Sequence, residues 1–118
     1  EQILVASIFM IGEAISVFDK WVRLKIITIQ ESQKIIQKFL LDMSALIEVG
    51  SLVLRKIDAF VILFSTELIT KHHLTINDAI HLNSALTATP KIRNFICADA
   101  LLNEAAKKEG LNVINPED

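Results

Sequence analysis

The sequence predicts an α/β domain in which a mostly parallel sheet is covered by helices on both faces. Short apolar runs alternate with longer segments in which apolar residues recur at helical intervals. The order of these segments is strand, helix, helix, strand, helix, helix, strand, helix, strand. The length of 118 residues suits one domain, 1–118, and we see no repeat, linker or second domain in it.

Each expected element has a reason in the sequence. Apolar runs of strand length predict four strands, at residues 3–6, 45–49, 94–98 and 111–114. Apolar residues at helical spacing predict five helices, which end at about residues 22, 41, 71, 88 and 109. The third of these helices is expected to begin at about Leu52, after the break at Gly50 and Ser51.

Several helix starts carry recognisable capping signals. Ser7 is expected to cap the first helix, because a serine hydroxyl can accept a hydrogen bond from a free backbone N–H. Thr28 and Thr75 are each followed three residues later by an acid, Glu31 or Asp78. This capping-box spacing predicts that the second and fourth helices begin there.

Composition limits the class of protein. Hydrophobic residues make up 52% of the chain and charged residues 22%, which excludes intrinsic disorder. The longest apolar stretch, residues 59–64, is far shorter than the roughly 18 residues of a membrane span, and no secretory signal is apparent, so we expect a cytoplasmic protein without membrane association. The single cysteine, Cys97, is expected to be reduced and structural. With a net charge of −2, any RNA binding must use a local basic patch or bound cations.

Asp99 is the first candidate for a functional carboxylate. It directly follows the apolar run 95–98, which places it at the carboxyl end of a buried strand, where open α/β sheets usually build their sites. A carboxylate there can be a metal ligand. It can equally be only the N-cap of the helix at 100–109, which Gly110 ends, and a cap contributes about 1 kcal/mol.

Asp78 and Glu13 are the other two candidates. Asp78 lies in the first turn of its expected helix, where the helix dipole favours a negative charge, so capping is the simpler interpretation. On a helical projection Glu13 lies between Phe9 and Val17, off the polar stripe of its helix. A carboxylate drawn toward apolar neighbours needs a partner, a proton or a cation, unless it reaches water at the boundary.

Histidines and basic residues give weaker signals. The three histidines have no carboxylate or cysteine at ligand spacing, so we expect surface or packing roles for His72, His73 and His81. The basic residues are scattered, as on a solvated surface. One small cluster can contact phosphate, namely Lys20, Arg23 and Lys25.

Two longer motifs resemble a known family. The segment 74–82, LTINDAIHL, and the segment 95–102, FICADALL, are similar to the two C-terminal motifs of PIN-domain proteins of the VapC-like toxin endoribonuclease type. The ending at 105–116 is also similar, and so is the N-terminal stretch that carries Glu13. The resemblance covers nearly the whole chain, strongly from Leu74 onward and weakly between residues 22 and 68. It implies a PIN-like three-layer α/β/α fold.

The resemblance also implies a chemistry. Glu13, Asp78 and Asp99 match acidic positions at which PIN nucleases hold Mg²⁺ or Mn²⁺ and activate water. The implied function is a metal-dependent endoribonuclease that hydrolyses RNA phosphodiester bonds, typical of the toxin in a toxin–antitoxin pair. The implied partners are an RNA substrate, an antitoxin protein and a second copy of the chain in a homodimer.

This sequence departs from the family in two places. Cys97 stands where many members have threonine or serine. The family begins with a central strand that ends in an aspartate, and nothing before Ile3 supplies it, so an N-terminally incomplete PIN-like domain with an open seam is expected. Residues absent upstream, a second chain in the seam and a degenerate fold are the three explanations.

Two other functions remain open. A PIN-like module that cannot cut RNA would dimerise or dock a protein partner on an apolar groove. An unrelated doubly wound α/β domain would use all three carboxylates only as helix caps. Binding of Mn²⁺ through Glu13, Asp78 and Asp99 separates the nuclease from both alternatives.

Overall fold

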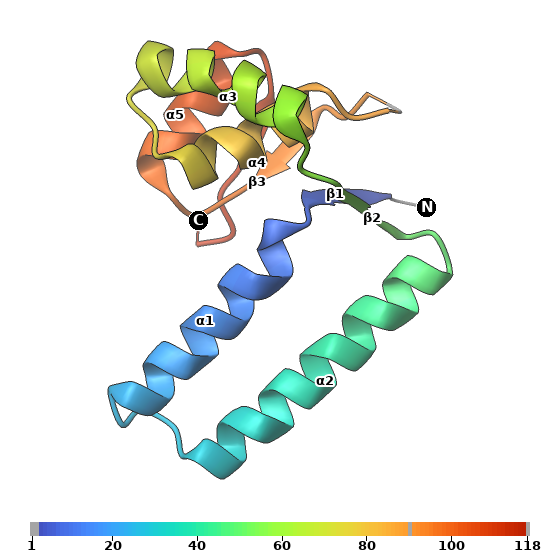
Figure 1. Ribbon diagram of the computed structural model, residues 1–118, viewed down its shortest axis with the longest axis vertical. Helices are drawn as coiled ribbons and strands as arrows, with labels where there is room; N and C mark the ends of the chain where they lie inside the picture. The colour runs from blue at the N-terminus through green and yellow to red at the C-terminus, as the bar shows by residue number, and fades with distance from the viewer. Residues whose placement is uncertain (1–2, 90, 118) are drawn as a thin grey trace. The chain divides into compact units, whose positions relative to one another are not determined.

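In the computed structural model, which describes residues 3–89 and 91–117, the strands and helices follow the predicted order (Figure 1). The strands are β1 (Leu4–Ser7), β2 (Leu52–Arg55), β3 (Asn94–Ile96) and β4 (Asn112–Ile114). The helices are α1 (Phe9–Arg23), α2 (Ile29–Glu48), α3 (Ala59–His72), α4 (Ile76–Leu86) and α5 (Ala100–Lys108). Among the helices in the described ranges, none combines the length and the apolar character that a membrane crossing requires.

The chain folds into two compact units, an N-terminal unit of Glu1–Leu54 and a C-terminal unit of Arg55–Asp118. In the N-terminal unit α1 and α2 form an antiparallel hairpin (Figure 1). Phe18 on α1 meets Phe39 on α2 with ring centroids 5.8 Å apart in an edge arrangement. Such an aromatic pair contributes about 0.5 to 1.5 kcal/mol beyond its buried area, so it holds the hairpin together.

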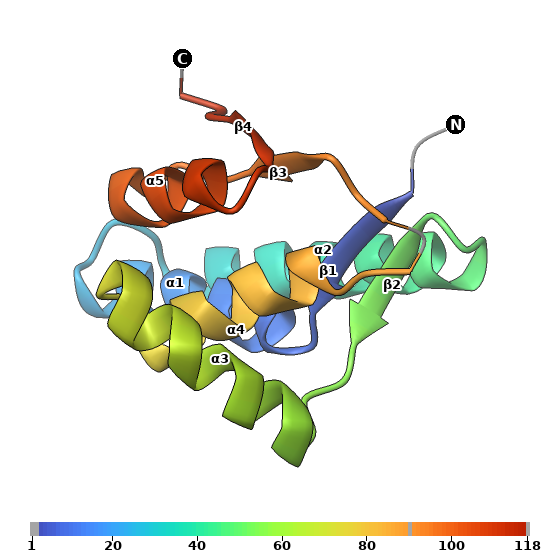
Figure 2. The ribbon, with the colours of Figure 1, turned by 90° about the horizontal axis from the view of Figure 1, so that it is seen from above.

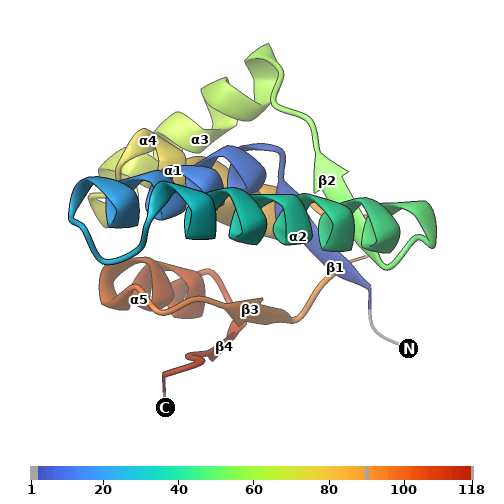
Figure 3. The same ribbon diagram turned by 90° about the horizontal axis from the view of Figure 1, so that it is seen from below.

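The C-terminal unit is built around α4. This helix lies between α3 on one side and α5 on the other (Figures 2 and 3). Its side chains are the most buried of the unit, with Ala79 and Leu82 at 0% exposure. Leu68 of α3 and Ala106 of α5 pack into the same hydrophobic cluster. The core of this unit therefore fixes the start of α4, where Asp78 lies.

Within the described residues the four strands form two separate two-stranded sheets, β1 with β2 and β3 with β4. The β3–β4 pair is parallel, with Phe95 opposite Val113. Both of these residues pack against the core of the C-terminal unit. The predicted α/β class is confirmed in this coarse form, whereas one continuous sheet covered on both faces is not what the described strands make.

The prediction of a strand at residues 45–49 is wrong. This segment completes α2, which ends at Glu48, and Gly50 follows with a φ of 79°. A short apolar run suits a buried strand or one face of a helix equally well, and here it prolongs a helix already begun. The strand is β2 instead, so the helix expected from about Leu52 starts later, behind the N-cap Asp58 of α3.

The prediction that Ser7 caps the first helix is also wrong. Ser7 is the last residue of β1 and is 1% exposed. The N-cap of α1 is Ile8, whose backbone is already helical and whose side chain offers no hydrogen bond. A serine before a helical pattern is a common start signal, but the strand here runs one residue further and carries the serine into buried surroundings.

The other capping predictions are confirmed. Thr28 and Glu31 form a complete capping box, in which the Thr28 hydroxyl accepts from the Glu31 N–H at 3.0 Å and the Glu31 carboxylate accepts from the Thr28 N–H at 3.0 Å. Thr75 accepts from the N–H of Asp78, and Gly110 follows α5 with a φ of 94°. These capping contacts join residues that are three or four positions apart, so they depend little on the tertiary packing.

Candidate functional site

Asp78 is fixed by the first turn of α4. Thr75 caps this helix in an extended backbone conformation, and its hydroxyl accepts from the Asp78 N–H at 3.3 Å. Asp78 itself is half-buried and is the acidic residue of the first turn. The helix dipole stabilises a negative charge in the first turn of a helix, so the position of the Asp78 carboxylate at the start of α4 is electrostatically favourable.

Asp99 is fixed by the corner between β3 and α5. Its Oδ1 accepts from the Leu102 N–H at 2.8 Å, so the N-cap interpretation is confirmed. Its own N–H donates to the Cys97 sulfur at 3.3 Å. Asp99 is nevertheless exposed, and the cap uses only one of its two carboxylate oxygens. Capping and ligand binding are therefore compatible at this residue.

The structure brings Asp78 and Asp99 to a common neighbour. Burial raises the pKa of the Cys97 thiol, and the negative charges of Asp99 and Asp78 raise it further. A thiolate is disfavoured near other negative charges, which is the physical reason for the second effect. The two C-terminal acids matched by the resemblance thus act on one sulfur atom although they come from different helices.

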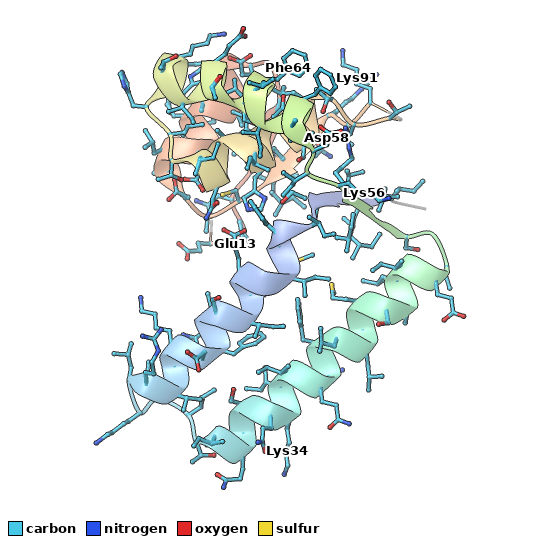
Figure 4. The ribbon with its side chains drawn as sticks, viewed as in Figure 1. Glu13, Lys34, Lys56, Asp58, Phe64 and Lys91 are labelled. Carbon is cyan, nitrogen blue, oxygen red and sulfur yellow. The ribbon has the colours of Figure 1, made fainter. Side chains whose placement is uncertain are left out.

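Glu13 belongs to the other unit. It is half-buried on α1 (Figure 4). Asp78 and Asp99 are both in the C-terminal unit. Phe9 and Val17, its expected apolar neighbours, remain 40% and 44% exposed. The prediction that Glu13 completes the carboxylate set therefore stays a prediction.

A metal ion bound only by protein requires several ligand side chains close together. Across residues 3–89 and 91–117, no three or more His, Cys, Asp or Glu side chains are grouped so that they could hold a metal ion. Asp78 and Asp99 have the right chemistry, because hard cations such as Mg²⁺ take carboxylate oxygens and keep several waters. One or two carboxylates can suffice for such a cation when water and substrate phosphates supply its other ligands.

A helix residue that sequence reasoning missed supports the Asp99 corner. Asn103 is 7% exposed, and its Nδ2 donates to the Cys97 carbonyl at 2.7 Å. Its neighbours Leu102, Ala105 and Ala106 are buried and apolar. A polar residue on the apolar face of a predicted helix is the signal that could have revealed it, because most buried side-chain amides form hydrogen bonds.

His72 has the packing role that was expected. Its side chain is 3% exposed, and its Nε2 lies 2.6 Å from a Glu109 carboxylate oxygen that also pairs with Lys71 at 2.7 Å. The hydrogen bond from Lys71 and, to a smaller extent, the one from His72 hold the pKa of Glu109 below its ordinary value. The cluster joins the end of α3 to the end of α5. No local pattern signals it, because His72 and Glu109 are far apart in sequence.

Comparisons with known proteins add no relative. No family model matches the chain, and neither the curated proteins nor the solved structures contain a match.

Proposed function

We propose that this protein is a PIN-like endoribonuclease of the VapC type, which hydrolyses RNA phosphodiester bonds with Mg²⁺ or Mn²⁺. One observation carries the proposal. Asp78, in the first turn of α4, and Asp99, the N-cap of α5, are the two acids in the motifs that resemble the family, and the negative charge of each raises the pKa of the Cys97 thiol. A toxin role in the cytoplasm, an antitoxin partner, a homodimer and the three-layer fold belong to the same proposal.

Asp78 and Asp99 would hold the cation, with Glu13 as the third carboxylate. Two carboxylates near one another repel when no cation is present, so cation binding relieves this repulsion. A bound divalent cation supplies positive charge that stabilises the phosphodiester oxygens and eases deprotonation of water. The first turns of α4 and α5 add backbone N–H groups, which favour an anionic substrate nearby.

The exposure of Asp99 suits this role. Its Oδ1 is committed to the Leu102 N–H, so the carboxylate cannot rotate freely and Oδ2 is held in one direction. A ligand oxygen that is already oriented loses less conformational entropy on binding. The cap thus preorganises one coordinating atom.

The test is loss of Mn²⁺-dependent RNA cleavage by the full-length protein. Asp78→Asn and Asp99→Asn should each lower the rate by more than about 100-fold, because an amide cannot supply the ligand charge, whereas asparagine caps a helix as well as aspartate does. Cleavage of a radiolabelled RNA at several Mn²⁺ concentrations measures this.

Asp58→Asn is the matched control. Asp58 is the N-cap of α3 and accepts from the Val61 N–H at 2.9 Å, which is the cap that Asp99 makes on α5 (Figure 4). The same substitution there should leave cleavage unchanged. If Asp99→Asn cuts at the parent rate, or Asp58→Asn loses as much activity, the assignment of Asp99 to the metal is wrong.

A binding module without catalysis is the second candidate function. One side of α3 packs on the core through Ser65, Leu68 and His72, while the opposite side exposes Phe60, Leu63 and Phe64 by 68%, 61% and 59%. The rings of Phe60 and Phe64 stack with centroids 6.5 Å apart. A contiguous apolar patch of this kind typically marks an interaction surface.

Calorimetric titration with Mn²⁺ distinguishes the two candidates. A nuclease binds Mn²⁺ in the parent, and Asp78→Asn and Asp99→Asn weaken that binding. A scaffold shows no such binding, while Phe64→Glu changes its sedimentation coefficient by disrupting self-association. Mn²⁺ binding that both aspartate variants leave intact would count against the nuclease.

A further inference from the structure

Asn103 is costly for the fold as it stands. Its side chain is buried among apolar neighbours on α5, and its Oδ1 has no hydrogen-bond partner within the part of the chain that the structure describes. A buried acceptor without a partner costs free energy that a leucine at the same position would avoid. The single bond that Asn103 makes is therefore the reason to look for a role beyond packing.

The orientation of the amide follows from that bond. The atom 2.7 Å from the Cys97 carbonyl oxygen is Nδ2, a donor. The reversed amide would set two acceptor oxygens against each other at that distance, which is repulsive. The buried Oδ1 is thus the consequence of directing the donor at Cys97.

Cys97 directly follows β3 and lies two residues before Asp99. Its N–H donates to the Ile114 carbonyl of β4 at 3.1 Å, its carbonyl accepts from Asn103, and its sulfur accepts from the Asp99 N–H at 3.3 Å. The corner is therefore tied to β4 on one side and to α5 on the other. Without the Asn103 bond, the peptide unit between Cys97 and Ala98 loses its link to α5.

We propose that Asn103 is a positioning residue, which holds this corner so that the Asp99 carboxylate keeps one direction toward the cation. The inference rests on the proposed nuclease function. Asn103 does not touch the cation or the RNA; it acts through the peptide unit two residues before Asp99. Hydrogen bonds that orient metal ligands in this indirect way typically change metal affinity or activity by about 10- to 100-fold when removed.

The test is Asn103→Leu, which removes the donor at similar side-chain size. Amide hydrogen exchange at Asp99 and Leu102 should rise about tenfold in the metal-free full-length protein, because the corner opens more often. The Mn²⁺ concentration for half-maximal RNA cleavage should rise by about tenfold or more. Asn103→Asp, which keeps the shape and replaces the donor by an acceptor, is the second variant and should give the same exchange result if Asn103→Leu does not fold.

Leu68→Ala is the stability control, since Leu68 is a buried core residue of α3 without a role at the corner. It should lower the melting temperature without raising the Mn²⁺ requirement. Parent-like exchange at Asp99 and Leu102 in the Asn103 variants, or an equal rise in the Mn²⁺ requirement in Leu68→Ala, overturns the positioning role. A parent that neither binds Mn²⁺ nor cleaves RNA overturns the proposed function instead, and the exchange data then still decide whether Asn103 holds the corner.

Discussion

The helices of the C-terminal unit share a buried apolar cluster, whereas the two helices of the N-terminal unit bury no apolar residue in the part of the chain that the structure describes. In the former, α3, α5 and the β3–β4 pair pack around α4, and the core cluster includes Leu82, Ala79 and Ala106 at 0% exposure. In the latter α1 has no buried residue, and the only residue of α2 that is buried in the described ranges is Ser32. Apolar content alone therefore does not decide where a core forms. A helix becomes buried when other elements pack on two of its sides.

The N-terminal unit has a different source of local order. Its helices are connected by the ring contact of Phe18 with Phe39, and α2 starts in a complete capping box. Apolar side chains such as Ile26, Leu41 and Val49 are more than 60% exposed. Two packed helices can hide only the side chains along one line of contact, so the remaining apolar residues stay accessible.

The largest difference between the units should appear when a leucine is shortened in each. Leu82→Ala, in α4, removes a fully buried side chain and should lower the free energy of unfolding by about 2 to 5 kcal/mol. Leu41→Ala, in α2, changes a side chain that is 64% exposed and should cost less than about 0.5 kcal/mol. Guanidinium unfolding followed by circular dichroism measures both.

An equal cost for the two substitutions would break the comparison. It would mean that Leu41 is covered in solution, for example by a second copy of the chain. In that case the cost of Leu41→Ala should depend on protein concentration, whereas the cost of Leu82→Ala should not.

Local signals explain most of the fold that the sequence could predict. The capping box at Thr28 and Glu31 and the N-cap at Asp99 are decided by neighbours within three residues, and the structure has them where the sequence places them. The segment 45–49 failed because a short apolar run has no local feature that separates strand from helix. Pairing of strands into two sheets is likewise set by contacts distant in sequence, which no window of residues contains.

Some features of the candidate site follow from local signals, and others depend on the tertiary fold. The positions of Asp78 and Asp99 at the starts of α4 and α5 could be predicted, because each follows a capping or strand-end signal in its own segment. The link of Asn103 to Cys97 lay within one short segment, yet it depends on how tightly the chain turns from β3 into α5. The contact of His72 with Glu109 joins two helices, so only the folded chain reveals it.

Substitution of Glu109 should have an intermediate effect on the free energy of unfolding. It tests whether the largely buried contacts of Glu109 stabilise the C-terminal unit. Glu109→Gln removes the charge that pairs with Lys71 and His72 and should cost about 1 to 3 kcal/mol at neutral pH. Unfolding by guanidinium at several pH values measures it. Glu104→Gln, on the exposed side of α5, is the control and should be close to neutral.

The pH dependence of this effect has a definite sign. Because the folded protein lowers the pKa of Glu109 from 4.5, the folded state binds its proton less readily than the unfolded state does. The stabilisation is fully present above about pH 4.5 and is lost as the pH falls through the lowered pKa. The stability difference between parent and Glu109→Gln should therefore shrink with acidification below that pH. A difference that stays constant would show that the carboxylate charge does not stabilise the unit.

The smallest effect concerns the N-terminal unit and its dependence on local order. Thr28→Ala removes the hydroxyl that accepts from the Glu31 N–H, whereas the backbone N–H at position 28, which donates to the Glu31 carboxylate and lowers its pKa, is kept. The cost should be about 1 kcal/mol. Trp21, the single tryptophan, lies on α1 with its ring 5.6 Å from that of Phe18, so its fluorescence reports unfolding of this unit.

Thr66→Ala is the matched control, because Thr66 is an exposed threonine whose hydroxyl only donates back to the Leu63 carbonyl within α3. Such a bond inside a helix adds little stability, so this substitution should change the unfolding free energy by less than about 0.5 kcal/mol. If Thr28→Ala is equally silent in the Trp21 transition, the capping box does not limit the stability of the hairpin. The ring contact of Phe18 with Phe39 would then be the contact to remove next, since it joins the two helices rather than ordering either alone.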